Sequence, residues 1–120
     1  MGVEPVLSNC LTAALEAGRP VPVKPTSIAD GLNAPFAGAL PLEIVQEHGI
    51  TTVHVEEEEI EAAMRLLYER AKLACEPAGA VAVAALLSGK LPAQEGKTVV
   101  CVVTGGNVSA ETAAAILARR

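Results

Sequence analysis

The sequence has 120 residues, which is enough for one domain with a single core. Hydrophobic residues make up 51% of it, a share typical of a folded rather than a disordered chain. The net charge of −5 argues against a nucleic-acid partner, and no apolar run reaches the roughly 18 residues that a membrane-spanning helix needs.

The cysteines do not suggest a disulfide framework. Cys10, Cys75 and Cys101 are odd in number and show no C-x-x-C spacing, so neither paired disulfides nor a thiolate metal site is expected. The first ten residues have neither the basic region nor the apolar run of a secretory signal. Both observations predict a protein of the reducing cytoplasm.

A short strand and a helix are expected first. Residues 3–4 read as part of a strand. Residues 10–17 predict a helix because their apolar side chains recur at three- and four-residue steps, and Gly18 is placed to end it. Residues 19–25 contain three prolines, so this segment must be extended.

The next part of the sequence is irregular and then ordered again. Residues 26–38 mix turn residues with apolar ones, and an apolar loop of this length is usually packed or functional. Residues 42–48 predict a short helix, which Gly49 ends. Residues 50–55 are rich in β-branched side chains and predict a strand.

Residues 57–73 give the clearest helix prediction. One face of this helix is apolar at three- and four-residue steps. The glutamates of the run at 56–59 lie at its start, where they favour the positive end of the helix dipole. This structural interpretation explains the acidic run without a metal site.

The last third predicts helix, strand and helix. Pro77 suits the first position of a very apolar helix over residues 78–87, which should be buried on most sides. The continuous apolar run at 98–103 predicts a strand buried on both faces. Ser109 is a plausible N-cap for a helix over residues 110–117.

Strands that alternate with helices predict an α/β fold with a mainly parallel sheet. Three short strands make a small sheet for so many apolar helices. We therefore interpret residues 1–120 as a single partial domain that belongs to something larger.

Three polar or glycine positions stand at the ends of apolar segments. The turn Thr104-Gly105-Gly106-Asn107 follows the apolar run, Glu76 separates two apolar helices, and Gly31 lies in the irregular loop. Strand and helix ends converge on ligand pockets in α/β proteins. A plain tight turn at 104–107 and an ordinary linker charge at Glu76 are the open alternatives.

The sequence shows no nucleophile-base-acid constellation. It has no G-x-S-x-G, H-E-x-x-H or P-loop pattern. His48 and His54 are interpreted as structural or exposed residues. No lysine has the apolar setting that lowers a pKa for Schiff-base chemistry; the lysines are Lys24, Lys72, Lys90 and Lys97.

Three stretches taken together carry a resemblance. SIADG at 27–31, EPAGA at 76–80 and VVTGGN at 102–107 resemble the C-terminal part of the threonine dehydratase, serine dehydratase and serine racemase family. These are fold-type II enzymes that depend on pyridoxal phosphate, and the likeness extends from Val3 to Leu117. It implies a partial three-layer parallel-sheet domain, the C-terminal portion of the family's large domain, from the threonine dehydratase-like branch.

The resemblance also implies roles at one pocket. Thr104 matches the Ser or Thr whose hydroxyl hydrogen-bonds the pyridine nitrogen of the cofactor. Gly105, Gly106 and Asn107 would shape that turn. Gly31 matches a loop glycine whose backbone borders the cofactor, and Glu76 matches a carboxylate lining the same pocket; these residues are the cofactor-binding prediction.

A cation site is implied as well. Glu4 aligns with one of its carboxylates, and Ser8 aligns with a backbone carbonyl ligand. The third position, often Asp in the family, is Cys10 here. A hard cation prefers oxygen ligands, so this departure weighs against the site.

Two features of the family are missing from the sequence. Its Schiff-base lysine, in a Ser-x-Lys-x-Arg-type segment, and its glycine-rich phosphate cup belong upstream of Glu4. The expected function is thus that of the C-terminal portion of a threonine or serine ammonia-lyase, inactive alone. We expect a homo-oligomer or association with a missing N-terminal half, and a small amino acid as substrate. The alternatives are serine racemase-like activity, a non-catalytic interaction module, and a phosphate or nucleotide binder.

Overall fold

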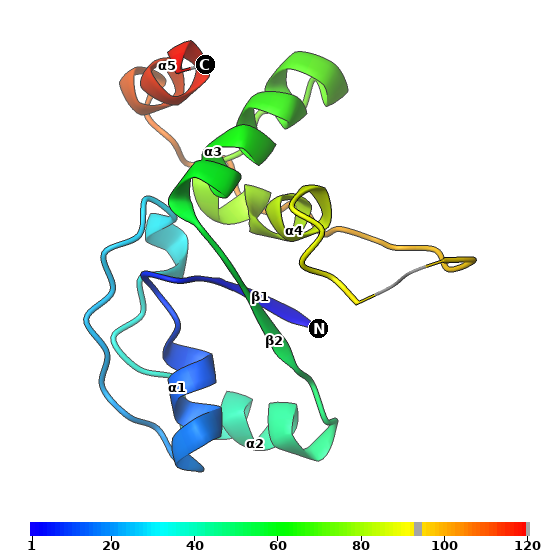
Figure 1. The fold of residues 1–120 in the computed structure, drawn as a ribbon. Coiled ribbons are helices and arrows are strands. Elements are labelled where there is room, and N and C mark those ends of the chain that lie inside the picture. The colour runs from blue at the N-terminus through cyan, green and yellow to red at the C-terminus, as the bar shows by residue number, and fades with distance from the viewer. Residues whose placement is uncertain (93–94, 120) are drawn as a thin grey trace.

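The computed structural model describes residues 1–92 and 95–119 (Figure 1). Strand β1 (Gly2–Pro5) pairs in parallel with β2 (Thr52–Val55), with Gly2 opposite Thr52 and Pro5 opposite Val55. The helices are α1 (Cys10–Ala17), α2 (Ala39–Glu47), α3 (Glu57–Leu66), α4 (Pro77–Leu87) and α5 (Ala110–Ala118), with a 3-10 turn η1 (Asp30–Leu32) and a π-helical turn η2 (Leu67–Ala71). Within the described ranges, no helix is both long and apolar enough to cross a membrane.

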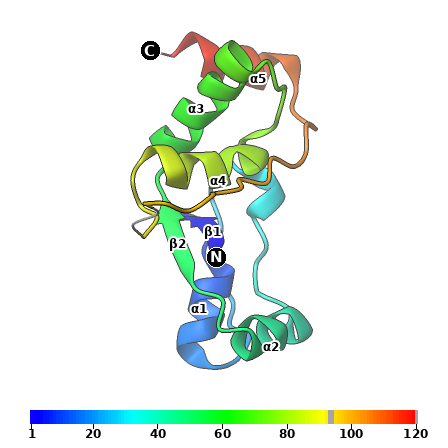
Figure 2. The same cartoon turned by 90° about the vertical axis from the view of Figure 1, so that its right-hand side faces the viewer.

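Helices cover both faces of this small sheet. Val3, Val53 and Val55 belong to the main apolar core, which also contains most of α4. The alternate residues, such as Glu4 and Thr52, face α1 instead, because both are hydrogen-bonded to Thr12 of that helix. Figure 2 shows α4 on one side of the strands and α1 and α2 on the other. The layered α/β arrangement with parallel strands is therefore confirmed.

The observed ends of the first three helices agree with the predicted ends to different degrees. Helix α1 has the predicted bounds, and Gly18 ends it in the left-handed region at φ 67°. Helix α2 begins three residues before the predicted start. Helix α3 is shorter than the predicted 57–73, because its last part is the π-helical turn η2, which Lys72 closes at φ 58°.

Helix α4 is the centre of the core. Its first residue is Pro77, as expected, and seven of its eleven residues are buried. It packs along α3, where Ile60 and Met64 are completely buried. Most of its residues are alanine, glycine or valine, so the chain passes close to its surface on several sides.

The predicted strand at 98–103 is not a strand in the described structure. The segment runs extended beside α4 (orange in Figure 2), and it shares no backbone hydrogen bond with any described residue. Cys101 and Val103 pack on the core, whereas Val100 and Val102 are 80% and 67% exposed. The prediction of burial on both faces is thus wrong. A strand needs a hydrogen-bonded neighbour, and none of the described segments takes that place.

Candidate functional site

The N-terminus of α4 and the turn after residue 103 are bound to each other through Glu76. The backbone N–H of Glu76 donates to the carbonyl oxygen of Gly105 over 3.2 Å. The backbone N–H of Asn107 donates to Oε2 of Glu76 over 3.0 Å. Glu76 is also the N-cap residue of α4, with extended backbone angles. The structure therefore brings together Glu76 and the glycine turn, which the sequence placed 28 or more residues apart.

Two glycines permit this close approach. Gly105 has φ 71°, and a Cβ at this position would overlap the carboxylate of Glu76. Gly79, in the first turn of α4, lies directly under the carbonyl oxygen of Thr104, so a Cβ there would overlap that oxygen. The backbone of Thr104 is thus seated on α4, while its side chain remains exposed to solvent.

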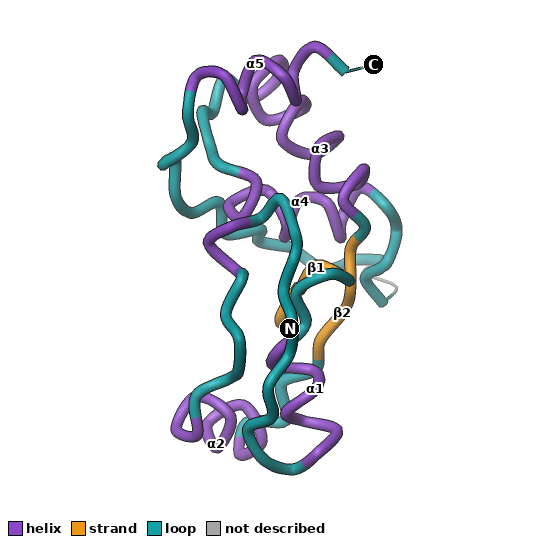
Figure 3. The backbone as a smooth tube through the Cα atoms, turned by 90° about the vertical axis from the view of Figure 1, so that its left-hand side faces the viewer, coloured by secondary structure: helices purple, strands orange, loops and turns teal. Residues whose placement is uncertain are grey.

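The loop that carries Gly31 is held in place by an acidic residue of α3. Oε1 of Glu57 accepts a hydrogen bond from Oγ of Ser27 over 2.8 Å, and Oε2 accepts from the N–H of Ile28 over 2.7 Å. A Cβ on Gly31 would lie 3.3 Å from Oε1 of Glu76, so this loop reaches the same carboxylate. Figure 3 shows the long connection, coloured as loop, that brings it there.

Sequence reasoning missed the role of Glu57. It lies in a run of four consecutive glutamates, and nothing in the run distinguishes it from Glu56 or Glu58. The neighbouring Glu56 and Glu59 form a capping box at the start of α3, which agrees with the structural interpretation of the acidic run.

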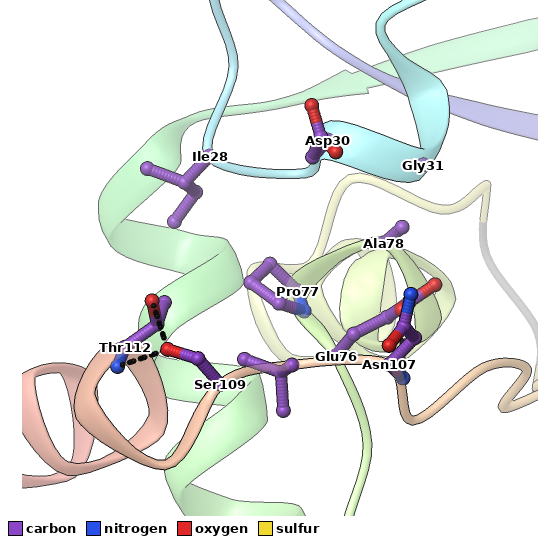
Figure 4. A pocket seen from close by; sticks show the side chains of 10 residues that line it. Ile28, Asp30, Gly31, Glu76, Pro77, Ala78, Asn107, Ser109 and Thr112 are labelled. Carbon is purple, nitrogen blue, oxygen red and sulfur yellow. Dashed lines mark hydrogen bonds between the residues drawn. The ribbon is translucent and has the colours of Figure 1, made fainter.

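A cavity of about 380 Å³ lies between these three segments (Figure 4). It is lined by Ile28, Asp30, Gly31, Glu76, Pro77, Ala78, Asn107, Val108, Ser109 and Thr112. Its volume is in the range of small-molecule sites. Of the six residues predicted to bind the cofactor, Gly31, Glu76 and Asn107 line the cavity, and Thr104, Gly105 and Gly106 lie on the turn next to it.

The charges around this cavity argue against a phosphate site. Its ionisable lining residues are Asp30 and Glu76, both acidic. The N-terminus of α5 is adjacent, but Oγ of Ser109 already accepts the N–H of Thr112 over 3.1 Å (Figure 4). The alternative of a phosphate or nucleotide binder thus finds no support here.

Neither of the predicted cation ligands, Glu4 and Ser8, lines this cavity. Glu4 is 8% exposed, and its oxygens accept hydrogen bonds from the N–H of Leu11, from the N–H of Thr12 and from the hydroxyl of Thr12, over 2.8, 2.9 and 2.6 Å. Oγ of Ser8 donates to the carbonyl of Leu32 over 2.5 Å. Burial, followed by the charge of Glu4, raises the pKa of the Cys10 thiol above its usual range.

The described residues contain no group of three or more His, Cys, Asp or Glu that would hold a metal ion. The carboxylate of Glu4 instead stabilises the N-terminus of α1. A cation site at Glu4 and Ser8 stays a prediction from the resemblance.

Parallel strands with helices on both faces, and a cavity where a helix N-terminus meets a glycine turn, place the chain in the class of layered α/β domains. Residues 1–105 match the family described as "Pyridoxal-phosphate dependent enzyme", and the chain belongs to this family.

Relatives with curated names and solved structures agree with this assignment. The chain is 39% identical to a phenylserine dehydratase of Ralstonia pickettii, over 93% of this chain and 35% of the relative. It is 38% identical to an L-threonine ammonia-lyase of Geobacter sulfurreducens, over 99% of this chain and 30% of the relative. The structure of maize serine racemase superimposes with a TM-score of 0.81 and 32% identity, over 91% of this chain and 34% of the other. The chain thus spans about a third of the length of these proteins.

We predict that Glu76→Ala loosens the turn at 104–107. The substitution removes the acceptor of the exposed Asn107 N–H, so the free energy of unfolding should fall by about 0.5–1.5 kcal/mol in urea titrations, the net contribution of one hydrogen bond. Glu76→Gln keeps a side-chain oxygen for this bond and should recover at least half of the loss. Equal losses for the two variants would show that the hydrogen bond contributes nothing.

Proposed function

We propose that this chain supplies the wall of the site that faces the pyridine ring of pyridoxal phosphate, in an ammonia-lyase that converts L-threonine to 2-oxobutanoate and ammonia by β-elimination. The proposal rests on the close contact between the Thr104 backbone and α4. Glu76 holds this contact through its hydrogen bonds to the turn, and Gly79 permits it because it has no side chain. The names of the dehydratase and ammonia-lyase relatives support the reaction class.

The residues present fit one edge of the cofactor. The hydroxyl of Thr104 is exposed and has no hydrogen-bond partner among the described residues, so it is free to bind a ring nitrogen. Gly31 and Gly105 both leave space beside Glu76 that a Cβ would fill. The cavity offers neither a basic side chain nor a glycine run for the cofactor's phosphate, which must be bound by another part of the protein.

Pyridoxal phosphate, when bound, supplies an electron sink for the substrate's amino-bearing carbon. Residues of this chain would set the electron-withdrawing strength of the cofactor ring. The hydroxyl of Thr104 would donate a hydrogen bond to the ring nitrogen, and unlike a carboxylic acid it is too weak an acid to protonate that nitrogen, which would stay largely unprotonated. That environment favours loss of a β-hydroxyl over transamination. Glu76 positions the Thr104 hydroxyl, because its hydrogen bonds hold the turn that carries Thr104.

We further propose that the chain works only together with a portion that carries the reactive lysine and the phosphate cup. The assembly would be a cytoplasmic homo-oligomer or a pair of associated halves, with a small amino acid as substrate. The likeness to maize serine racemase supports a second candidate activity, racemisation of serine. Product analysis separates the two: a 2-oxo acid indicates the lyase, and D-serine indicates the racemase.

The proposal predicts that the chain alone does not form a stable covalent adduct with the cofactor. Its lysines lie in exposed positions, and Lys90 is paired with Glu59 over 2.7 Å. We expect no adduct on any single lysine after incubation with pyridoxal phosphate and borohydride, as measured by intact-mass and peptide mass spectrometry. A stoichiometric adduct on one lysine would refute the dependence on a second portion.

A further inference from the structure

We propose that Glu57 is a positioning residue for the cofactor. Its carboxylate fixes the loop at residues 27–31 beside α4 before the cofactor binds, and the position of this loop determines how tightly the cofactor is held. The inference deepens the proposed function and rests on it, because the loop is one wall of the cavity assigned there to the cofactor ring.

The loop forms a continuous part of the cavity wall. Ile28, Asp30 and Gly31 line the cavity from the loop (Figure 4). The first residues of α4, Pro77 and Ala78, line it from the other side. The two walls are close, because a Cβ on Gly31 would lie only 3.1 Å from Cβ of Ala78. A small displacement of the loop therefore changes the shape of the cavity.

The loop has little regular structure of its own. Residues 19–29 belong to no helix or strand, and Asp30 begins the 3-10 turn η1. The backbone hydrogen bonds in this stretch are short-range: the N–H of Asp30 donates to Ile28, and the N–H of Leu32 donates to Ala29. Local bonds of this kind shape a turn but do not fix its position relative to α4. Side chains from other elements must do so.

Glu57 makes that connection with both of its carboxylate oxygens. Oε1 accepts from Oγ of Ser27 over 2.8 Å, and Oε2 accepts from the N–H of Ile28 over 2.7 Å. Ser27 is buried, and its Oγ accepts in turn from the N–H of the fully buried Ala29 over 3.0 Å. Hydrogen bonds to an ionised carboxylate are among the strongest in proteins. One side chain thus fixes three consecutive residues of the loop.

Helix α3 does not need this carboxylate for its own N-terminus. Glu56 and Glu59 already close it with a capping box. The side chain of Glu57 is therefore available to bind the loop. Because α3 packs along α4, a loop fixed to α3 is also fixed relative to the cavity wall formed by α4.

A loop that is already in place costs the cofactor nothing to order. Without Glu57, the loop would occupy its position in only a fraction of the molecules, and the apparent affinity would fall by that fraction. A loop in place about one tenth of the time would raise the apparent dissociation constant about tenfold. Excess cofactor should overcome this loss, because the binding step alone is weakened.

Amide hydrogen exchange in the chain alone tests whether Glu57 holds the loop. Glu57→Ala should increase the exchange rates at residues 28–33 by at least about tenfold. Glu58→Ala is the matched control, because it removes a carboxylate from the same turn of α3. Glu58 is exposed, and its side chain makes no hydrogen bond to the described residues, so the parent rates are expected. Parent rates in Glu57→Ala would overturn the inference.

Binding of pyridoxal phosphate, measured by absorbance titration, tests the effect on the cofactor. The chain would replace the matching stretch of the Geobacter sulfurreducens L-threonine ammonia-lyase. We expect an apparent dissociation constant about tenfold higher in Glu57→Ala and unchanged in Glu58→Ala, with activity restored by excess cofactor. Ser27→Ala should also raise the constant, and the double variant should be no worse than Glu57→Ala, because both changes break one link.

The outcomes separate this inference from the proposed function. A folded Glu57→Ala hybrid with the parent's dissociation constant overturns the inference alone, since a purely structural role would alter only the free energy of unfolding. If Glu57→Ala does not fold, Ser27→Ala decides in the same way: a raised constant supports the inference, and the parent value overturns it. A parent hybrid that does not bind pyridoxal phosphate refutes the proposed function and the effect on affinity together.

Discussion

Replacing Gly79 with alanine is expected to lower the free energy of unfolding by about 3 kcal/mol, the upper range for overpacking. In an exposed helix the same change would stabilise by about 1 kcal/mol, because alanine has the higher helix propensity. The sign reverses here because the new Cβ would overlap the carbonyl oxygen of Thr104 and lie 3.2 Å from that of Gly105. Both are backbone atoms, so α4 and the turn must separate.

Gly106→Ala is the matched control for this experiment, since it lies on the same turn. A Cβ on Gly106 would meet the carbonyl oxygen of Ala74 at 3.6 Å, an ordinary contact, so the change in stability should stay within about 0.5 kcal/mol. Urea unfolding followed by circular dichroism measures both variants. A stable Gly79→Ala variant, or equal losses for the two, would show that Thr104 is not seated on α4.

Glu4→Ala should also destabilise the chain by about 3 kcal/mol. The buried carboxylate accepts hydrogen bonds from two backbone N–H groups at the start of α1 and from the hydroxyl of Thr12. Its removal leaves these donors unsatisfied beside the sheet, and unpaired buried donors cost about 1–3 kcal/mol each before relaxation.

Glu16→Ala serves as the control, because Glu16 is an exposed residue of the same helix whose side chain makes no hydrogen bond to the described residues. We expect a change within about 0.5 kcal/mol for it in the same urea titration. If Glu4→Ala costs no more than Glu16→Ala, the carboxylate does not hold α1 to the sheet.

Local signals in the sequence were sufficient for several elements. Gly18 ends α1 and Pro77 begins α4 as predicted, because a left-handed cap and a fixed φ depend only on the residue itself and its neighbours. The apolar composition of α4 likewise predicted its burial. For these elements, propensity and tertiary packing point to the same structure.

Features that depend on distant partners were predicted less well. The apolar run at 98–103 has the composition of a buried strand, but strand formation requires a neighbouring backbone, and composition does not reveal whether one is present. The role of Glu57 follows from its contacts with Ser27 and Ile28, which are 30 and 29 residues away in the sequence, and no contact among the described residues explains the π-helical turn at the end of α3. No periodicity reports them.

The candidate site was predicted in part. Physical reasoning placed Gly31, Glu76 and Thr104 at ends of apolar segments, and the structure gathers these segments around α4. The contact of Gly79 with the turn could not be anticipated, because a glycine inside a helix carries no sign of what approaches it. The role of Thr104 toward the cofactor rests on the family resemblance.

A hybrid enzyme tests the central claim most directly. The chain would replace the matching third of the Geobacter sulfurreducens ammonia-lyase, to which it aligns over 120 residues. We predict a hybrid that binds pyridoxal phosphate and deaminates L-threonine, and a Thr104→Ala form whose kcat is lower by about 100-fold, the scale for losing one positioned hydrogen-bonding group. Thr104→Ser, which keeps the hydroxyl, should retain most activity. A folded, cofactor-loaded hybrid in which Thr104→Ala is as active as the parent would contradict the claim that this turn is the wall facing the cofactor ring.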